Sequence, residues 1–99
     1  MRIEIRPAFD EAVMAAEPAV RKAAAKMLVL LQSLELVDPW KHPGLNFEKL
    51  HGMIEPDTGH QLYSLRVTAS ARAVTCLLSG STLVLISLHV QHDKAYRKR

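Results

Sequence analysis

The chain has 99 residues, of which 48% are hydrophobic and 23% are charged. These are ordinary values for one globular domain, so disorder of the whole chain is excluded. Thirteen Lys and Arg residues against ten Asp and Glu residues give a net charge of +3. A surplus of this size does not by itself identify a nucleic-acid-binding protein, so the placement of the charges has to decide. We expect a single domain over residues 1–99.

A single cysteine, Cys76, rules out an intramolecular disulfide and with it a secreted, disulfide-stapled scaffold. Residues 1–6 carry charge in every second place and lack the apolar region of a signal peptide. The longest apolar stretches fall far short of the roughly 20 residues that a membrane span needs. The sequence therefore indicates a cytoplasmic protein without a membrane partner.

The first half of the chain predicts a strand and two helices. Residues 2–6 alternate in polarity, which is typical of a half-buried strand. Asp10 is expected to cap a short helix over residues 11–16, and Pro18 to occupy the first turn of a second helix. Apolar residues at spacings of three and four make this second helix amphipathic, up to the stop at Asp38-Pro39.

The second half predicts an irregular segment and then three strands. Residues 39–60 contain three prolines and three glycines and are expected to be irregular. Strands are expected at residues 62–67, 72–78 and 83–90, with a hairpin turn at residues 79–81. The predicted fold is α+β, in the order β-α-α-β-β-β. A mainly antiparallel sheet packs on the helix pair, and a short basic C-terminal tail follows.

The last hairpin has two apolar faces in this interpretation. One row consists of Val84, Ile86, Leu88 and Val90, and Leu83 and Leu85 lie on the other side. Since the helix pair can cover only one face, the second face is either covered by the chain itself or awaits a partner. A two-residue turn at residues 80–81 would also place Arg72 opposite His89.

Four segments in this order resemble the RelE/ParE toxin superfamily: residues 46–52 (NFEKLHG), 63–67 (YSLRV), 71–74 (ARAV) and 92–96 (HDKAY). The resemblance covers nearly the whole chain. It implies the toxin of a bacterial type II toxin–antitoxin pair, with a cognate antitoxin protein as partner. In the RelE branch the toxin cuts mRNA in the ribosomal A site and inhibits translation, and in the ParE branch it poisons DNA gyrase. The chain is also similar to a RelE-like domain attached to UvrD-type helicases.

The resemblance implies a metal-independent endoribonuclease without a cofactor. Cleavage by the RNA 2′-hydroxyl needs a base, cations beside the developing phosphorane and an acid for the leaving oxygen. The matching positions offer four candidate catalytic residues: Arg66, Arg72, His92 and Tyr96. The candidate RNA-binding residues are Lys49, His51, Lys94, Arg97 and Lys98. No Cys, Asp or Glu completes a standard metal-ligand spacing with the histidines, so no metal site is expected.

Each candidate has an alternative role. Arg66 is either a clamp on the scissile phosphate or a surface ion-pair partner, and Arg72 is either functional or a structural hydrogen-bond donor. The family often has an aromatic residue before the second arginine, where this chain has Ala71. His92 is an acid–base group or a helix-capping or solvent-facing side chain, and Tyr96 contacts RNA or anchors the tail.

Two functions therefore stay open from the sequence. The first is a ribosome-dependent mRNA endoribonuclease, in which the basic tail tracks RNA phosphates. The second is a non-catalytic interaction module of the same fold: a gyrase inhibitor, a helicase-associated domain or an inactive toxin, with a solvated terminus.

Overall fold

The computed structural model describes residues 1–34, 41–78 and 82–91, which form five strands, two α-helices and one 3-10 turn. In chain order these are β1 (Arg2–Ile5), α1 (Pro7–Ala15), α2 (Pro18–Ser33), η2 (Pro43–Leu45), β2 (Glu48–Ile54), β3 (Gln61–Arg66), β4 (Ala71–Leu78) and β5 (Thr82–Val90).

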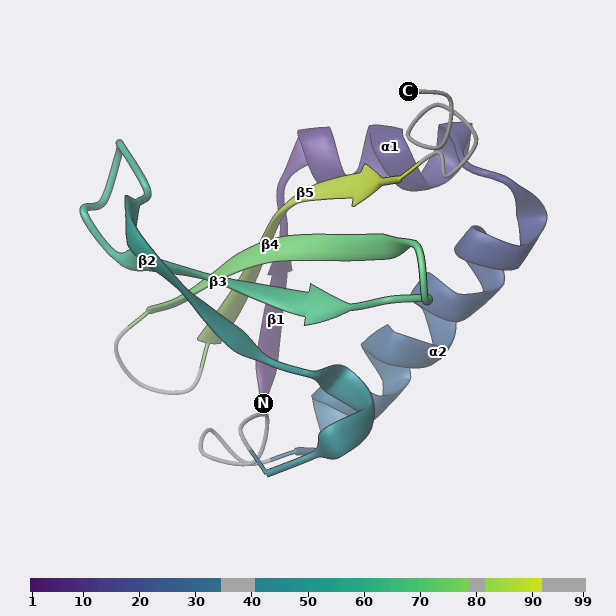
Figure 1. The fold of residues 1–99 in the computed structure, drawn as a ribbon, viewed down its shortest axis with the longest axis horizontal. Helices are drawn as coiled ribbons and strands as arrows, with labels where there is room; N and C mark the ends of the chain where they lie inside the picture. Colours follow the sequence, from purple (N-terminus) through teal and green to yellow (C-terminus); the bar gives the residue numbers. More distant parts are fainter. Residues whose placement is uncertain (35–40, 79–81, 92–99) are drawn as a thin grey trace, which may run out of the picture.

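The strands make one sheet in the order β1-β5-β4-β3-β2. The pairs from β2 to β5 are antiparallel, and β1 joins β5 in parallel. Both helices lie on one side of this sheet, with α1 along β5 (Figure 1). The α+β fold predicted from the sequence is therefore confirmed, with one strand more than expected.

Both helices begin at a proline. Pro18 stands in the first turn of α2, as predicted, because a proline there gives up only an N–H that the helix cannot use. Pro7 does the same for α1, so the predicted cap at Asp10 is wrong: Asp10 lies inside the helix and Arg6 is the N-cap residue. The carboxylate of Asp10 in the first turn still favours the positive end of the helix dipole.

The core lies between the helices and one face of the sheet. Phe9 from α1 and Leu31 from α2 are at most 1% exposed, and they meet Leu65, Leu83 and Leu85 from the strands, each fully buried. Burying side chains of this size stabilises the fold by about 1.5–3 kcal/mol each. This helix-covered face therefore supplies most of the stability of the domain.

Strand β2 corrects the prediction that residues 39–60 are irregular throughout. Its register with β3 shifts between Lys49 and Ile54, and Gly52 in this stretch has a φ of +78°. The amide of Gln61 donates hydrogen bonds to the carbonyl oxygens of Leu50 (2.6 Å) and Met53 (3.0 Å), which satisfies backbone groups that the irregular ladder leaves open. The strand is nearly all exposed and lacks alternation, so its sequence does not show it.

A bulge in β5 corrects the prediction of two apolar faces. Val74 pairs with Ser87 and Thr75 pairs with Leu85, so Ile86 is left without a partner in the ladder. An extra residue of this kind reverses the alternation beyond it. Leu88 and Val90 therefore join the core face of Leu83 and Leu85 instead of lying in a row with Val84.

The same bulge explains why Arg72 does pair with His89, as predicted. Leu78 pairs with Thr82, which leaves three residues between the strands where two were assumed. The unpaired Ile86 compensates for the additional turn residue, so the far end of the hairpin returns to the predicted register. The turn residues 79–81 themselves lie outside the described residues.

Candidate active site on the open face of the sheet

The face of the sheet opposite the helices, called the open face below, carries a polar cluster formed by Glu48, Ser64, Arg72, Ser87 and His89. These residues come from four neighbouring strands. The strand register places them opposite the core positions, because each alternates with a buried residue such as Leu65, Ala73 or Leu88.

Arg72 is the centre of the cluster. Its Nη2 donates hydrogen bonds to the Oγ of Ser64 (2.8 Å) and to the carbonyl oxygen of Asn46 (2.9 Å), and its Nε donates to the same Oγ (3.3 Å). Nη2 also lies 3.5 Å from Oε1 of Glu48. The guanidinium is thus turned across β3 towards the start of β2, and Nη1 makes no hydrogen bond or ion pair with the described residues.

Local backbone geometry fixes the acceptors around Arg72. Asn46 has a φ of 44°, in the left-handed region that asparagine tolerates better than most residues, and it ends the η2 turn. Next to it, the ring of Phe47 stacks on Tyr63 with centroids 4.9 Å apart and planes at 15°. This contact anchors the start of β2 on β3 and so places Glu48 beside Arg72.

His89 lies at the other end of the cluster. Its Cα pairs with that of Arg72, but its Nε2 makes a 2.9 Å hydrogen bond with the Oγ of Ser87 on its own strand. The Arg72 side chain runs the other way, towards β2. Three strand spacings of about 4.8 Å separate the β2 and β5 backbones, roughly 14 Å in all, so Glu48 and His89 lie at opposite ends of the cluster and do not touch.

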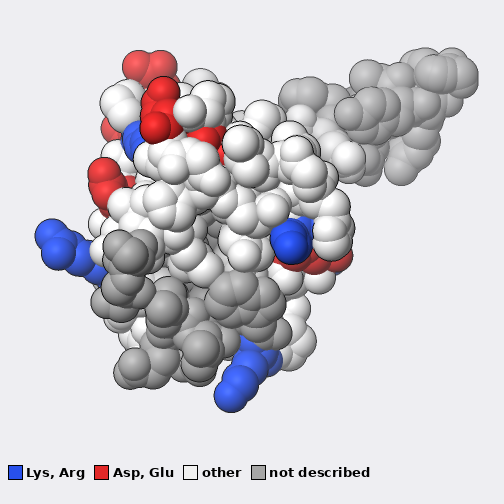
Figure 2. Space-filling view, turned by 90° about the vertical axis from the view of Figure 1, so that its left-hand side faces the viewer, with Lys and Arg blue, Asp and Glu red and all other residues white. Residues whose placement is uncertain are grey.

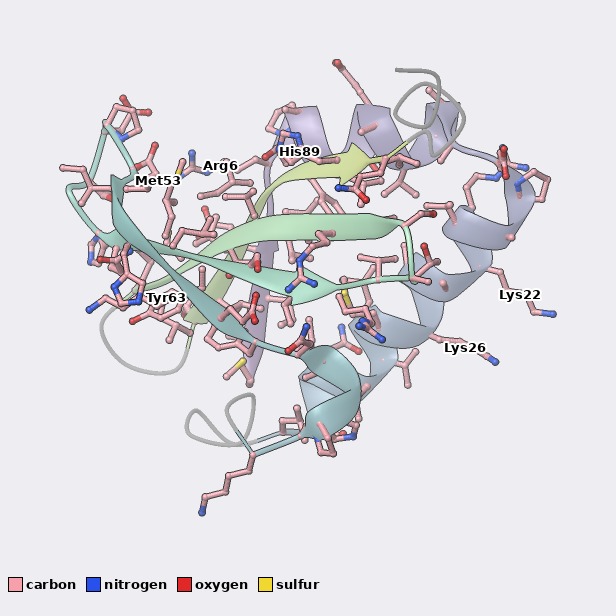
Figure 3. The ribbon with its side chains drawn as sticks, in the orientation of Figure 1. Arg6, Lys22, Lys26, Met53, Tyr63 and His89 are labelled. Carbon is pink, nitrogen blue, oxygen red and sulfur yellow. The ribbon has the colours of Figure 1, made fainter. Side chains whose placement is uncertain are left out.

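The far half of the open face is closed by the chain itself. Cys76 and Val84 are paired and fully buried there, although neither lies on the helix side. Above them, Oε2 of Glu55, in the turn after β2, lies 3.9 Å from Nη1 of Arg6, which follows β1. Since β1 and β2 are opposite edges of the sheet, this contact requires the β2–β3 turn to fold over the face; Figure 3 labels Arg6 and, on β2 just before this turn, Met53. The sequence left open whether the chain or a partner covers this face, and at this end it is the chain.

The Glu55–Arg6 contact is called the clasp below. The carboxylate of Glu55 also accepts hydrogen bonds from the backbone N–H and the hydroxyl of Thr58. Burial acts to raise the pKa of Glu55, but hydrogen bonds from the Thr58 side chain and from the backbone of Asp57 and Thr58, with the nearby Arg6 charge, outweigh it. The pKa of Glu55 therefore lies below its usual value. Beneath the clasp, burial raises the pKa of the Cys76 thiol, which agrees with an unreactive structural cysteine.

Arg66 is separated from the cluster, although it pairs with Arg72 across β3 and β4. It is exposed, as predicted, but it lines a groove beside α2 and makes no ion pair or side-chain hydrogen bond within the described residues. The surface ion pair considered as its alternative role is thus not formed there. The structure does not bring Arg66 together with the acceptors that hold Arg72.

The other predicted site residues are not gathered around Arg72 in the part of the chain that the structure describes. Lys49 pairs with Tyr63 and so lies on the opposite side of β2 from Glu48; His51 is exposed in the irregular part of the same strand. The remaining candidates lie outside the described residues: His92, Lys94, Tyr96, Arg97 and Lys98.

Positive charge is not concentrated on the side of the molecule that carries the β2–β3 turn. Figure 2 shows most carboxylates of that side at one corner and others beside a basic side chain at the opposite edge, while the Lys and Arg side chains stand apart from one another. A cationic site has to be sought in local arrangements such as that of Arg72.

A cavity of about 380 Å³ lies away from the polar cluster, between the α1–α2 connection and the end of β5. Its walls are mainly small and apolar, with Ala15, Val20 and Leu88 among them, and Glu17 is its one charged residue among those described. Among the described lining residues, Glu17 has no second acid–base group or cation beside it to act with. Within the described ranges, no three His, Cys, Asp or Glu side chains gather as a metal site. Neither described α-helix has the length and hydropathy for crossing a bilayer.

Sequence reasoning missed Glu48, Ser64 and Asn46. Ser64 could have been found from its place two residues before Arg66 on the same strand face. Glu48 stands inside the segment Asn46–Gly52 that carries the family resemblance, but its contact with Arg72 depends on the unpredicted strand β2.

Comparisons with known proteins agree with this architecture. No protein-family model and no curated protein sequence matches the chain. Among solved structures, a RelE from the archaeal RelE–RelB complex of Pyrococcus horikoshii superposes with a TM-score of 0.66 at 16% identity, covering 90% of this chain and 92% of that one.

Two further toxins are similar. A YoeB/ParE toxin from Agrobacterium tumefaciens gives a TM-score of 0.58 at 16% identity, covering 93% of this chain and 100% of that one. A copper-bound mutant toxin from Helicobacter pylori gives 0.53 at 15% identity, with 95% and 97% covered. The chain therefore has the RelE/ParE-like toxin fold, as the resemblance in its sequence implied.

Proposed function

We propose that the chain is the toxin of a type II toxin–antitoxin pair and that it cuts mRNA on the ribosome. The observation that carries this proposal is the polar cluster of the open face, in which Arg72 is held beside the carboxylate of Glu48. A fixed guanidinium with unused donors next to an ionisable carboxylate suits cleavage of a phosphodiester by the neighbouring 2′-hydroxyl.

The roles follow from the chemistry. Glu48, whose side chain is 60% exposed, can take the proton of the 2′-hydroxyl. Arg72 keeps Nη1 for an oxygen of the phosphate, where negative charge grows in the transition state. Ser64 and the carbonyl group of Asn46 orient the guanidinium, so that it need not be ordered when the substrate binds.

The acid for the leaving oxygen comes from the end of β5 in this proposal. His89 lies on the correct face there, and His92 remains the sequence-based candidate for the same role, with Tyr96 as a contact to the RNA. Lys49, His51, Lys94, Arg97 and Lys98 remain proposed RNA-binding residues.

The partners of this function are the ribosome with its mRNA and a cognate antitoxin, in the cytoplasm. Support for an antitoxin comes from the similar fold of a RelE that was solved together with RelB. The exposed polar cluster offers a surface that such a partner has to block to silence the toxin.

The proposal is tested by expressing the chain under an inducible promoter and mapping the 5′ ends of mRNA, and by repeating the cleavage with purified ribosomes. Growth should stop, and cuts should appear within translated codons. We expect Glu48→Gln and Arg72→Gln each to lower the cleavage rate by about a hundredfold or more, as for loss of a general base or of an oxyanion donor.

Lys22→Gln is the matched control, because it also removes one charge but lies on α2, where its side chain extends away from the sheet (Figure 3). It should cut at the wild-type rate. Intact mRNA and normal growth with folded protein present, or full activity of both cluster variants, would contradict the proposal.

One observation favours a second candidate, a non-catalytic module such as a gyrase inhibitor. Arg72 already has three internal partners, as a structural arginine would. A supercoiling assay with DNA gyrase separates the two: inhibition that survives both cluster variants, without mRNA cleavage, would establish this alternative.

A further inference from the structure

The two paired arginines, Arg66 and Arg72, differ in how their charge is compensated. Like charges directly opposite each other on neighbouring strands destabilise a sheet. Arg72 relieves this by turning to Glu48, whereas Arg66 has no carboxylate partner within the described part of the chain. An arginine at such a position without an internal counterion has a charge available for an external anion.

Arg66 lines a groove of about 230 Å³ between α2, the η2 turn and the end of β3. At roughly 30 Å³ per water molecule, this volume holds several waters, and so a phosphate group with part of its hydration. Lys26 and His42 supply the other polar side chains of the lining, and no Asp or Glu belongs to it among the described residues. Three nitrogen-bearing residues thus line one groove from three segments of the chain, among otherwise apolar or glycine residues.

His42 is fitted to this place by its neighbour Gly44. A Cβ at Gly44 would lie 3.3 Å from Cε1 and 3.4 Å from Nδ1 of the imidazole, so a larger residue there would have to push the ring aside by a few tenths of an ångström. Nδ1 of His42 is buried and has no hydrogen-bond partner among the described residues. An orphaned ring nitrogen of this kind is costly unless a ligand or a ring rotation satisfies it.

Lys26 contributes at the rim. Its side chain extends from α2 away from the sheet, in the same direction as that of Lys22 (Figure 3). Lys26 is a lining residue of the groove, and a lysine at such a rim can pack its stem on apolar surface while its ammonium group stays in water. A ligand that continues beyond the groove along α2 would meet this positive charge.

We propose that this groove is a second phosphate-binding subsite, which holds a backbone phosphate of single-stranded RNA next to the one held at Arg72. The proposal rests on the proposed function for the identity of the RNA. The anion chemistry itself rests on Arg66, His42 and Lys26, and on the lack of carboxylates in the described lining. Arg66 lines the groove, and Arg72, its cross-strand partner, is the centre of the polar cluster. The two sites are therefore neighbours, and one strand of RNA can reach both.

The experiment measures binding of a fluorescein-labelled hexauridylate to the whole protein by anisotropy, at several salt concentrations. Arg66→Gln should weaken binding about five- to tenfold, the effect of losing one hydrogen-bonded charge contact. It should also reduce the slope of log affinity against log salt by about 0.7, as for one released phosphate counterion on a single strand. Lys22→Gln, which removes the same charge outside the groove, should change the affinity by less than about twofold.

A structural readout accompanies the affinity. In ¹H–¹³C NMR spectra, the ring signals of His42 should shift with the oligonucleotide in the wild type and stay fixed in Arg66→Gln. Equal losses for Arg66→Gln and Lys22→Gln, or unmoved His42 signals during saturating binding, would overturn the subsite. Inorganic phosphate that shifts His42 while the oligonucleotide does not would overturn its assignment to RNA.

Failure of this inference is distinguishable from failure of the proposed function. If the wild type cuts mRNA on ribosomes and Arg66→Gln binds the oligonucleotide as tightly as the wild type does, the subsite is wrong and the nuclease stands. If binding of the oligonucleotide depends on Arg66 but the protein does not cut mRNA, the subsite stands and the nuclease is wrong.

Discussion

The two faces of the sheet are held together in different ways. The helix-covered face joins two helices and all strands but β2 through apolar side chains such as Phe9, Leu65 and Leu85, with little water contact. The open face is joined by polar contacts: the clasp of Glu55 and Arg6 at one end and the hydrogen bonds of Arg72 at the other.

This difference separates stability from activity. Apolar burial is worth several times more per residue than a half-exposed ion pair. Changes on the helix-covered face should therefore unfold the protein, whereas changes on the open face should alter function in a folded protein. The following variants test this division, from the largest expected effect to the smallest.

Deletion of Ile86 should have the largest effect. Without the bulge, either the pair Leu88 and Val90 or the pair Leu83 and Leu85 would turn to the open face. Exposing two such side chains costs about 3–6 kcal/mol, a large part of the 5–15 kcal/mol that stabilises a typical domain. Circular dichroism should show an unfolded chain. Ile86→Ala, which keeps the residue count, should remain folded, and a deletion variant with the wild-type melting temperature would show that the bulge does not set the register.

Leu65→Ala should follow, because Leu65 is fully buried on the helix-covered face. Truncation of a buried leucine to alanine costs about 2–5 kcal/mol through lost burial and the cavity that it leaves. Urea denaturation measures this change in the free energy of unfolding. Val29→Ala on α2, where the side chain is 69% exposed, is the matched control and should stay within about 0.5 kcal/mol of the wild type.

Asn46→Ala tests a smaller contribution at the edge of the polar cluster. Alanine at a φ of 44° costs about 1 kcal/mol, whereas Asn46→Gly should be nearly neutral in that conformation. Both variants keep the carbonyl group that accepts from Arg72, so chemical denaturation should separate them while the Arg72 contact persists. Equal losses for both would mean that the asparagine side chain, and not its backbone conformation, matters.

Glu55→Gln should have the smallest effect, and one that depends on pH. The pKa of Glu55 is lowered in the folded protein, so its ionised form adds stability that is present above the pKa of the unfolded chain, near 4.3, and is lost as the pH falls through the folded pKa. The melting temperature of the variant should lie below that of the wild type at pH 7. The two should approach each other below about pH 4, and a difference that persists at low pH would exclude the carboxylate charge as its cause.

Much of the fold could be predicted because it has a local cause. Alternation in Leu62–Val67 and the spacing of Val20, Ala24 and Met27 both reflect one buried side of an element, which every residue of that element repeats. Strand β2 was missed because its residues are exposed on both sides and because Gly52 breaks its ladder. The bulge at Ile86 was missed because it depends on the length of the turn and on pairing with the partner strand β4. The alternation of polarity within β5 carries no information about either.

The candidate site could be predicted in part. Arg72 was singled out by its place in a family pattern, and its pairing with His89 came from hairpin arithmetic. Glu48 could not be joined to it, because their contact depends on β2 lying outside β3 in the sheet. The distinct surroundings of Arg66 were also hidden, since the helix that borders its groove is some 40 residues away in the sequence.

The parallel pairing of β1 with β5 also constrains how the chain folds. Arg2 pairs with Thr82, so β1 has no neighbour in the sheet until β5 has been synthesised. Closing a loop of this length costs about 4 kcal/mol of chain entropy, and only a four-residue edge strand offsets it, together with hydrogen bonds from the α-amino group to the carbonyl oxygens of Gln32 and Leu34. β1 is therefore expected to dock late, after the local hairpins. Because Arg6 directly follows β1, the clasp over the open face is completed in the same late step.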